Sequence, residues 1–260
     1  MNESYKGFIK KMILTMHKLL DDLKWQIEAG VDDSIGNELN KSIKNERNDV
    51  LINKITKPIE AINNETFDYR INGINTLKEL KKFLKDNDIC DLQKSSKNLI
   101  FSEINNDFKI MIISNIPDTD EDNLGEPIVE KNGELFDKIL NAANLSRSSV
   151  YITPIIPWRI PGNRDLSDEE KSICIPIIKK QIEIINPKIL ILLGSDPLKY
   201  LLDDDGMMKK RGKWLEYQQN KKIMMCLPIL DPSFLIRRPE YKRETWNDIL
   251  NLKEKIKELV

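Results

Sequence analysis

The chain has 260 residues, which is enough for one large domain or for one domain with an extension. Hydrophobic residues make up 40% of it, so the chain can bury a sizeable core. The 41 Lys and Arg residues nearly balance the 42 Asp and Glu residues, so the global charge indicates no anionic partner. Any surface that binds nucleic acid must therefore be local.

The cysteine pattern argues against a disulfide framework. Cys90, Cys174 and Cys226 are far apart, form no CxxC pair and are odd in number, and the chain shows no signal-peptide pattern. Together these features predict a reducing, cytoplasmic location. With a single histidine, His17, a four-ligand zinc site is not expected. No apolar run reaches the roughly 18 residues that a membrane span needs, so we expect no membrane partner.

The N-terminal part differs in composition and residue pattern from the rest of the chain. Over residues 1–30, apolar residues recur at spacings of three and four and end at Gly30, which predicts an amphipathic helix. Residues 31–75 are rich in Asn, Asp, Lys and Ser and predict a polar linker. Thr76 is suited to cap a short helix, and from there we expect a folded domain over residues 76–260.

Within this domain, four short apolar runs alternate with helical patterns. The runs cover residues 108–114, 150–156, 188–194 and 223–229. The helical patterns cover residues 133–143, 167–185, 197–202 and 243–259. The runs are continuous rather than alternating, as in strands that are buried on both faces. This order predicts an α/β domain with a parallel sheet and helices on both faces.

Ligands of such sheets bind at the carboxyl ends of the strands, so the loops after the four strands are expected to share one face. The first loop carries an acidic cluster around Asp118 and Asp122. Two interpretations remain open for it. A carboxylate could orient a water molecule, or the cluster could be a solvated loop that caps the next helix, and composition favours the second.

Two of these loops are basic. After the second strand, Arg159, Asn163 and Arg164 are candidates for contacts with phosphates, and Ser167 with Glu170 forms a capping box. The loop after the fourth strand holds further candidate phosphate ligands, with Leu235 in an apolar stretch near its tip. These ligands are Ser233, Arg237, Arg238, Lys242 and Arg243. Basic residues around an apolar wedge suit a protein that grips DNA and pushes a nucleotide out of the stack, but the apolar residues could equally pin the loop to the core.

Several segments resemble one known family. The segment "WRIPGNR" is the most specific, and "EDNLGEPIVEKNGELFDKIL" and "DPSFLIRRPEYKRETWNDI" support it. The chain resembles the uracil-DNA glycosylase superfamily, and within it the family 4 enzymes of an alphaproteobacterial branch. The resemblance implies a three-layer α/β/α sandwich around a four-stranded parallel sheet. It also implies hydrolysis of the bond between uracil and deoxyribose in DNA, with the base flipped into a pocket.

The positions that the family uses for chemistry are substituted here. Asn115 stands where an acid positions the water, with Asp118 nearby as a substitute carboxylate. Ile128 replaces the aromatic ring that stacks on uracil, and Pro154 replaces the asparagine that pairs with its polar edge. Asp231 replaces the histidine that steadies the departing uracil anion. The resemblance therefore implies a degenerate site that has kept the scaffold around it.

The family's iron–sulfur cluster is not expected. Cys90 and Cys174 fall at two of its four cysteine positions, and Asn87 and Trp158 occupy the other two. Two thiolates do not hold a four-iron cluster, so we expect no cofactor.

Three functions stay open on these grounds. The chain could be a DNA-binding relative with weak or lost glycosylase activity, an active glycosylase with a rearranged pocket, or a protein-interaction module that has kept only the fold. The first is favoured, with uracil-containing or single-stranded DNA as the partner. A monomer is the expected oligomeric state.

Overall fold

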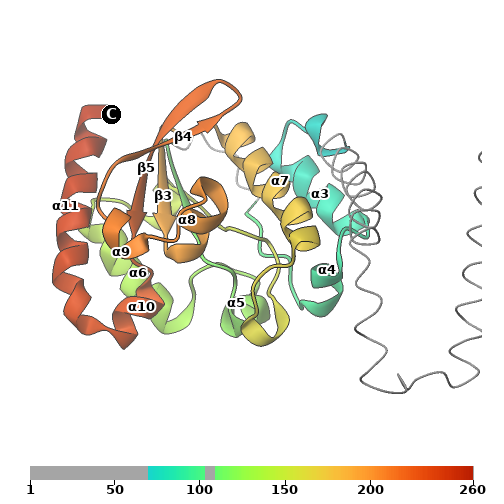
Figure 1. The fold of residues 1–260 in the computed structure, drawn as a ribbon, viewed down its shortest axis with the longest axis horizontal. Helices are drawn as coiled ribbons and strands as arrows, with labels where there is room; N and C mark the ends of the chain where they lie inside the picture. The colour runs from blue at the N-terminus through green and yellow to red at the C-terminus, as the bar shows by residue number, and fades with distance from the viewer. Residues whose placement is uncertain (1–69, 103–108, 260) are drawn as a thin grey trace, which may run out of the picture. The chain divides into compact units, whose positions relative to one another are not determined.

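The computed structural model describes residues 70–102 and 109–259 (Figure 1). The helix expected over residues 1–30 and most of the linker expected over 31–75 lie outside these residues. Residues 70–72 are helical, and the buried Ile71 packs in the hydrophobic core. The folded domain therefore begins before Thr76, where the sequence placed its start.

The expected α/β architecture is confirmed. The strands are β1 (Ile110–Ser114), β2 (Tyr151–Pro154), β3 (Ile189–Leu193), β4 (Leu215–Gln219) and β5 (Lys222–Ile229). They form one sheet in the order β2-β1-β3-β5-β4. The four expected strands β2, β1, β3 and β5 pair in parallel.

The sheet has five strands rather than the expected four. The additional strand β4 lies at the edge and pairs antiparallel with β5 through a hairpin at Asn220 and Lys221. Both hairpin residues have positive φ, 48° and 64°, as a tight two-residue turn requires. Of the strand's own residues only Tyr217 is buried, so β4 lacks the continuous apolar run that marks the other strands.

Helices of the described segments cover both faces of the sheet. They are α3 (Leu77–Asp86), α4 (Asp91–Ser95), α5 (Thr119–Leu124), α6 (Glu130–Ala142), α7 (Asp168–Ile185), α8 (Ser195–Leu202), α9 (Met207–Lys210), α10 (Pro232–Arg237) and α11 (Lys242–Leu259). Short 3-10 turns occur at η2 (Arg147–Ser149), η3 (Pro161–Asn163) and η4 (Pro239–Tyr241). Thr76 and Ser167 cap α3 and α7 as expected.

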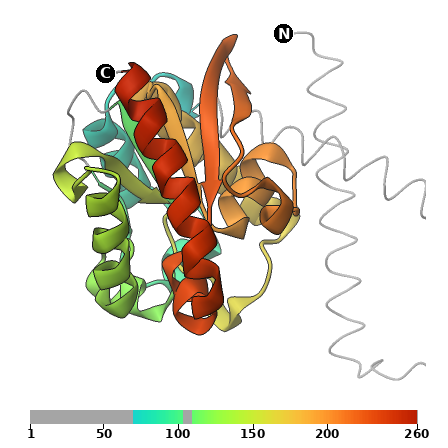
Figure 2. The ribbon, with the colours of Figure 1, turned by 90° about the vertical axis from the view of Figure 1, so that its left-hand side faces the viewer.

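The core explains why the parallel strands are apolar throughout. In β1, Met111 and Ile113 pack into one cluster with residues of α3 and α7. Ile110 and Ile112 pack into a second cluster with residues of α6 and α11. Successive strand residues point to opposite faces, so a sheet that is covered on both sides needs apolar residues at every position. Figure 2 shows α6 and α11 side by side over one face.

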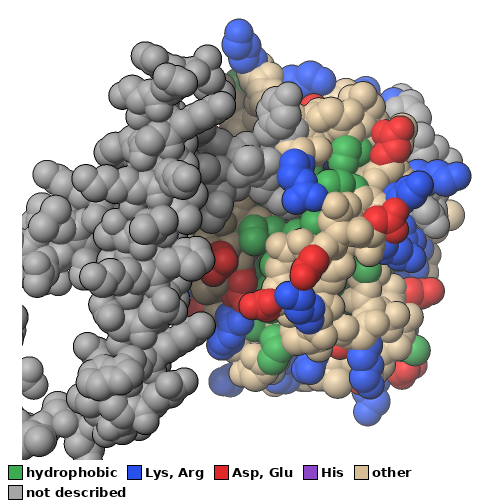
Figure 3. All heavy atoms as spheres, turned by 90° about the vertical axis from the view of Figure 1, so that its right-hand side faces the viewer, with side chains coloured by type: hydrophobic (Ala, Val, Ile, Leu, Met, Phe, Trp, Pro, Cys, Tyr) green, Lys and Arg blue, Asp and Glu red, His purple; other side chains and the backbone are tan. Residues whose placement is uncertain are grey.

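The surface carries mixed charge. On the face shown in Figure 3, Lys and Arg side chains lie among Asp and Glu side chains and do not gather into one basic patch. In the part of the chain that the structure describes, no helix is both long and apolar enough to cross a bilayer.

Candidate functional site

A cavity of about 180 Å³ lies where the carboxyl ends of β1, β3 and β5 meet. It is lined by Ser114, Asn115, Ile116, Asp118, Glu121, Ile128, Asn132, Asp196, Asp231 and Ser233. Four of these side chains are carboxylic acids, and the described lining contains no lysine or arginine. The loops after three of the four parallel strands thus meet at one site, as the topology predicts.

Asn115 is held in a fixed orientation at this site. The backbone N–H of Asp196 donates to Asn115 Oδ1 at 3.1 Å, and the N–H of Ile116 donates to Asp196 Oδ2 at 3.1 Å. These reciprocal bonds join the end of β1 to the start of α8. Burial raises the pKa of Asp196 above its usual value. The amide of Asn115 can orient a water molecule in the cavity, but it cannot take up a proton.

Asp118 and Glu121 form a capping box at the start of α5. Asp118 Oδ1 accepts from the N–H groups of Asp120 and Glu121, and Glu121 Oε2 accepts from the N–H of Asp118 at 2.8 Å. Glu121 Oε1 also accepts from the N–H of Ile128 at 2.6 Å. Burial raises the pKa of Glu121 to about 7, and the nearby carboxyls of Asp118 and Asp231 act in the same direction. The acidic cluster therefore caps a helix, as one of the two interpretations expected, but Glu121 and Asp122 are buried rather than solvated. Asp118 and Glu121 also line the cavity.

Asp231 caps α10. Its Oδ1 accepts from the N–H of Ser233 at 2.8 Å. Burial raises the pKa of Asp231, while its bonds to Ser233 and the charge of Arg237 oppose the shift. Asp231 thus has a role in local structure and lies at the cavity wall.

Ile128 and Pro154, the two expected base-pocket residues, occupy different places. Ile128 lines the cavity and is buried, with a positive φ of 54° that is uncommon for a β-branched residue. Arg147 clamps this segment by donating to the carbonyl of Ile128 at 2.6 Å. Pro154 is buried beside Ser114 at the end of β2 and is not part of the cavity lining.

The expected DNA-contact residues after β5 lie on α10, at its C-terminal end and at the start of α11. Arg237, Arg238, Lys242 and Arg243 are exposed, whereas Ser233 is partly buried at the cavity. Leu235, expected in an apolar wedge, is only 1% exposed and packs in the core. Its neighbour Ile236 is 41% exposed, so Ile236 is the apolar side chain that α10 presents to solvent.

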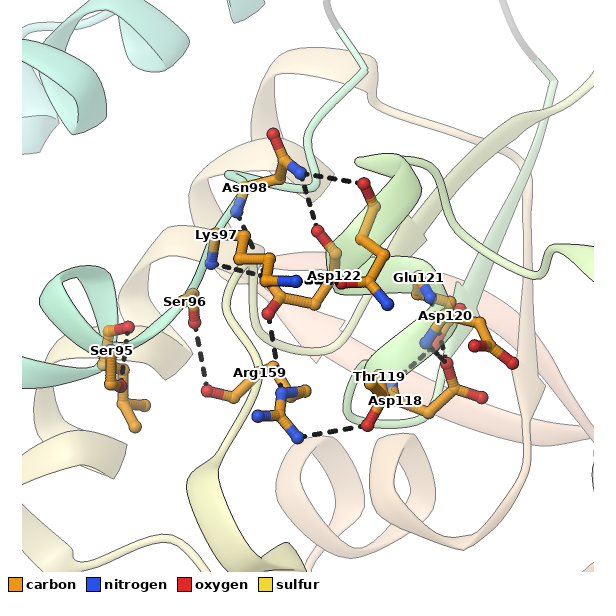
Figure 4. Close-up of polar contacts among 12 residues, drawn as sticks. Ser95, Ser96, Lys97, Asn98, Asp118, Thr119, Asp120, Glu121, Asp122 and Arg159 are labelled. Atoms are coloured by element: carbon orange, nitrogen blue, oxygen red, sulfur yellow. Dashed lines mark hydrogen bonds and ion pairs between the residues drawn. The ribbon is translucent and has the colours of Figure 1, made fainter.

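The two arginines expected to contact phosphates after β2 are engaged within the protein. Arg159 lies 3.5 Å from the buried Asp122 and donates to Thr119 Oγ1 at 3.2 Å, and Figure 4 shows it pointing at α5. Asp122 also accepts from the N–H groups of Lys97 and Asn98. This network joins the chain around residue 97, α5 and the loop after β2.

Arg164 forms an ion pair with Glu170 through two hydrogen bonds, and in one of them Arg164 Nη1 donates to Glu170 Oε2 at 2.7 Å. The bonds from Arg164 lower the pKa of Glu170 to about 2. Asn163 is the last residue of η3. In this arrangement Arg164 anchors its loop to the first turn of α7.

The residues that the resemblance assigns to the cluster positions do not fit an iron–sulfur cluster. The side-chain oxygen of Asn87 accepts a hydrogen bond from Arg70 at 2.7 Å, and its nitrogen donates to the carbonyl of Phe83 at 2.8 Å. Trp158 is buried. Within residues 70–102 and 109–259, no three His, Cys, Asp or Glu side chains are placed to hold a metal ion. Cys90 and Cys174 are free thiols, and a hydrogen bond with the Cys174 thiol lowers the pKa of Cys90 to about 7.

The fold and this site place the chain in a known class of proteins. The family model described as the uracil DNA glycosylase superfamily matches residues 101–250, and the chain belongs to this superfamily. Among curated proteins, it is similar to the type-4 uracil-DNA glycosylase of Thermotoga maritima, with 32% identity over 65% of this chain and 88% of that protein. It is similar to the type-4 enzyme of Archaeoglobus fulgidus, with 29% identity over 64% and 85% of the two chains. The type-4 enzyme of Saccharolobus solfataricus is 32% identical over 64% and 79%.

Sequence reasoning missed several residues of the site. Ser114, Asn132 and Asp196 line the cavity, and Trp246 is 50% exposed on α11, one turn after Lys242. Asp196 could have been found as the first acid after the third strand. Glu121 was noticed only as one member of an acidic cluster. The spacing of Asp118 and Glu121 matches a capping box and could have singled out Glu121.

Proposed function

We propose that this chain is a DNA-binding member of the superfamily, of base-excision-repair type, whose release of uracil from DNA is weak. The observation that carries the proposal is the ring of four carboxyl groups around the cavity, with Asp231 at the position that the family resemblance gives to histidine. The type-4 relatives support DNA as the partner. The three free cysteines support a reducing, cytoplasmic setting.

The weak activity follows from charge. When the bond between deoxyribose and uracil breaks, the uracil leaves with the bonding electrons as an anion. An ionised carboxylate about 4 Å away opposes that charge by about 4 kcal/mol at an effective dielectric constant near 20. Loss of a donor comparable to one oxyanion-hole bond removes about 3–4 kcal/mol more. Together these effects reduce the rate by several powers of ten.

The DNA-binding part of the proposal rests on the surface formed by α10, η4 and the first turn of α11. Arg237, Lys242 and Arg243 are exposed there, beside the exposed side chains of Ile236 and Trp246. Positive charges interleaved with apolar and aromatic side chains suit a nucleic-acid strand, since the charges contact phosphates and an aromatic ring stacks on a base. This surface adjoins the cavity because α10 begins at Asp231.

One observation favours a second candidate, an active glycosylase with a rearranged pocket. Burial raises the pKa of Asp231, and a protonated Asp231 is neutral and can donate a hydrogen bond to a departing anion. This candidate predicts faster release of uracil as the pH falls, because the protonated form then becomes more abundant.

Uracil release from a single-stranded oligonucleotide under single-turnover conditions tests the proposal. We expect slow release by the parent chain and faster release by the double variant Asp231→His/Pro154→Asn, which restores both family residues. Asp168→His, which places a histidine on an exposed position of α7, serves as the matched control and should leave release unchanged. Parent activity as high as that of a type-4 enzyme assayed alongside would refute weak release. Parent activity that increases steeply toward low pH would favour the second candidate.

A further inference from the structure

The charge of the cavity points to a particular class of ligand. Asp118, Glu121, Asp196 and Asp231 reach it from the loops after β1, β3 and β5. The charge of Arg237 acts on Asp231 and that of Lys199 acts on Asp196, but neither residue lines the cavity. A ligand inside therefore meets negative charge or carboxyl groups on several sides.

An independent observation shows that the cavity is suited to a polar ligand. Ser114 lines it and is only 2% exposed, yet its hydroxyl has no hydrogen-bond partner among the described residues. Buried hydroxyl groups are normally hydrogen-bonded, because a buried hydroxyl without a partner lowers the stability of the fold. A ligand that reaches Ser114 Oγ with a polar atom would remove this cost.

The size of the cavity limits the ligand. Its volume is about 180 Å³. This suits a single ring with its substituents and is below the roughly 300–1,000 Å³ of pockets for drug-sized ligands. Among nucleobases it therefore favours pyrimidines.

We propose that the cavity binds a positively charged pyrimidine extruded from DNA, of the N-alkylated type exemplified by 3-methylcytosine. The inference rests on the proposed function, because the base arrives on a DNA strand held by the surface of α10 and α11. The positive ring meets the carboxylates of the cavity, and its polar edge can reach Ser114 Oγ and the amides of Asn115 and Asn132. Uracil is neutral when bound and gains no such attraction.

The affinity of the cavity for a cationic base should depend on pH. Burial raises the pKa of Glu121 to about 7, so this carboxyl is largely neutral at pH 6.0 and largely ionised at pH 7.5. A cation binds the ionised form better, so its affinity should increase roughly eightfold over this interval if one such group must be ionised. An uncharged base of the same shape should show no such increase.

The test compares two oligonucleotides of the same sequence in which one base is cationic or neutral, with an amino group or a carbonyl oxygen at C4. Single strands carrying one 3-methylcytosine or one 3-methyluracil at the same position are titrated with the full chain, and an unmodified strand sets the background. We expect the 3-methylcytosine strand to bind about tenfold more tightly at pH 7.5, which corresponds to about 1.4 kcal/mol. Equal affinities, or a preference for 3-methyluracil, would overturn the inference.

Two variants connect the preference to the cavity. Asp231→Asn removes one charge, and Asn is as good an N-cap as Asp, so α10 should keep its start. Its preference for the 3-methylcytosine strand should decrease severalfold, with a melting temperature close to that of the parent. Glu258→Gln removes one exposed charge from the last turn of α11, at the other end of that helix from α10, and should change nothing (Figure 1).

The outcomes separate this inference from the proposed function. If the chain binds all strands equally and its affinity falls as salt is added, the proposed DNA binding holds and the cationic-base inference is wrong. If it binds no strand at low salt, both are wrong. A preference that Asp231→Asn leaves intact would also refute the role given to the cavity.

Discussion

The side chain of Asn115 lies directly over the backbone of Gly194, so the ends of β1 and β3 are in contact at the cavity. A Cβ atom added at Gly194 would overlap the amide group of Asn115. Gly194 has φ 102° and ψ −176°, a region of backbone conformation that is essentially restricted to glycine. The same amide accepts the bond from the N–H of Asp196. The position of Asn115 therefore depends on the absence of a side chain at residue 194.

Gly194→Ala should destabilise the chain and displace Asn115. The backbone strain alone costs about 1–3 kcal/mol, and the overlap with Asn115 adds to it. Gly162→Ala is a matched control, because Gly162 also has positive φ (73°) but has open space around it. Urea unfolding should give a clearly larger loss of the free energy of unfolding for Gly194→Ala. Equal losses in the two variants would contradict the packing of Asn115 over residue 194.

Glu121 should make the stability of the chain depend on pH. Burial raises its pKa from the usual value of 4.5 to about 7, so between these values the folded chain keeps a proton that the unfolded chain has released. Stability from this group is therefore present at low pH and is lost as the pH rises from about 4.5 to about 7, on the order of 3 kcal/mol in all.

The variant Glu121→Gln isolates this effect. Burial also raises the pKa of Asp248, to about 6, so this residue lowers stability as the pH rises over part of the same interval. Its effect is the same in the parent and in the variant. The free energy of unfolding, measured in urea from pH 5 to 8, should decrease more steeply with pH in the parent than in Glu121→Gln. Identical pH slopes would mean that Glu121 titrates normally.

Cys90 should be the most reactive of the three cysteines. A hydrogen bond with Cys174 lowers its pKa to about 7, whereas the pKa values of the buried Cys174 and Cys226 thiols are raised. Iodoacetamide at pH 7.5 should label Cys90 first, as followed by mass spectrometry of peptides. In Cys174→Ala the midpoint of the labelling profile should move up toward about 8.5, the usual thiol value. Cys226→Ala is the control, and an unchanged profile in Cys174→Ala would show that the two thiols do not interact.

Trp246 should contribute to the binding of single-stranded DNA. Its side chain is half exposed on α11, and Lys242 and Arg243 lie four and three positions before it, on the same side of the helix. Trp246→Ala should weaken binding of an unmodified oligonucleotide by about 1–3 kcal/mol if one base stacks on the ring, as measured by fluorescence anisotropy. Ile223→Ala is the control, because it removes a comparably exposed apolar side chain at the N-terminal end of β5, the end away from α10. This variant should bind the oligonucleotide as tightly as the parent does. Parent-like binding by Trp246→Ala would place the strand elsewhere.

Much of the fold could be predicted because the parallel strands are covered on both faces. Residues such as Met111 and Ile112 are apolar although they point in opposite directions, and this makes their strand easy to recognise. The edge strand β4 was missed because only Tyr217 in it is buried and its turn, Asn220–Lys221, contains no glycine. The short helices α5 and α10 were missed because six residues are too few to show a helical period.

The site was predicted less completely, for a different reason. The resemblance to the superfamily implied Asn115, Asp118, Ile128 and Asp231 as site residues, and all four line the cavity. The topology of the sheet alone indicated only that the loops at its carboxyl edge converge. Pairing between side chains depends on the tertiary structure. The sequence could not show that Arg159 contacts Asp122. Nor could it show that Leu235, rather than Ile236, turns into the core, because a short basic loop has no period to indicate its buried side.

The central claim is that the chain binds DNA through α10, η4 and the start of α11. The dependence of the DNA affinity on salt concentration tests this claim most directly. For the four exposed basic residues Arg237, Arg238, Lys242 and Arg243, the logarithm of the affinity for a single strand should fall with the logarithm of the KCl concentration with a slope of about −2.8, at roughly 0.7 per phosphate contact. Replacing all four with Gln should remove most of this slope. An affinity that does not depend on salt, or a slope that survives the fourfold replacement, would contradict the account.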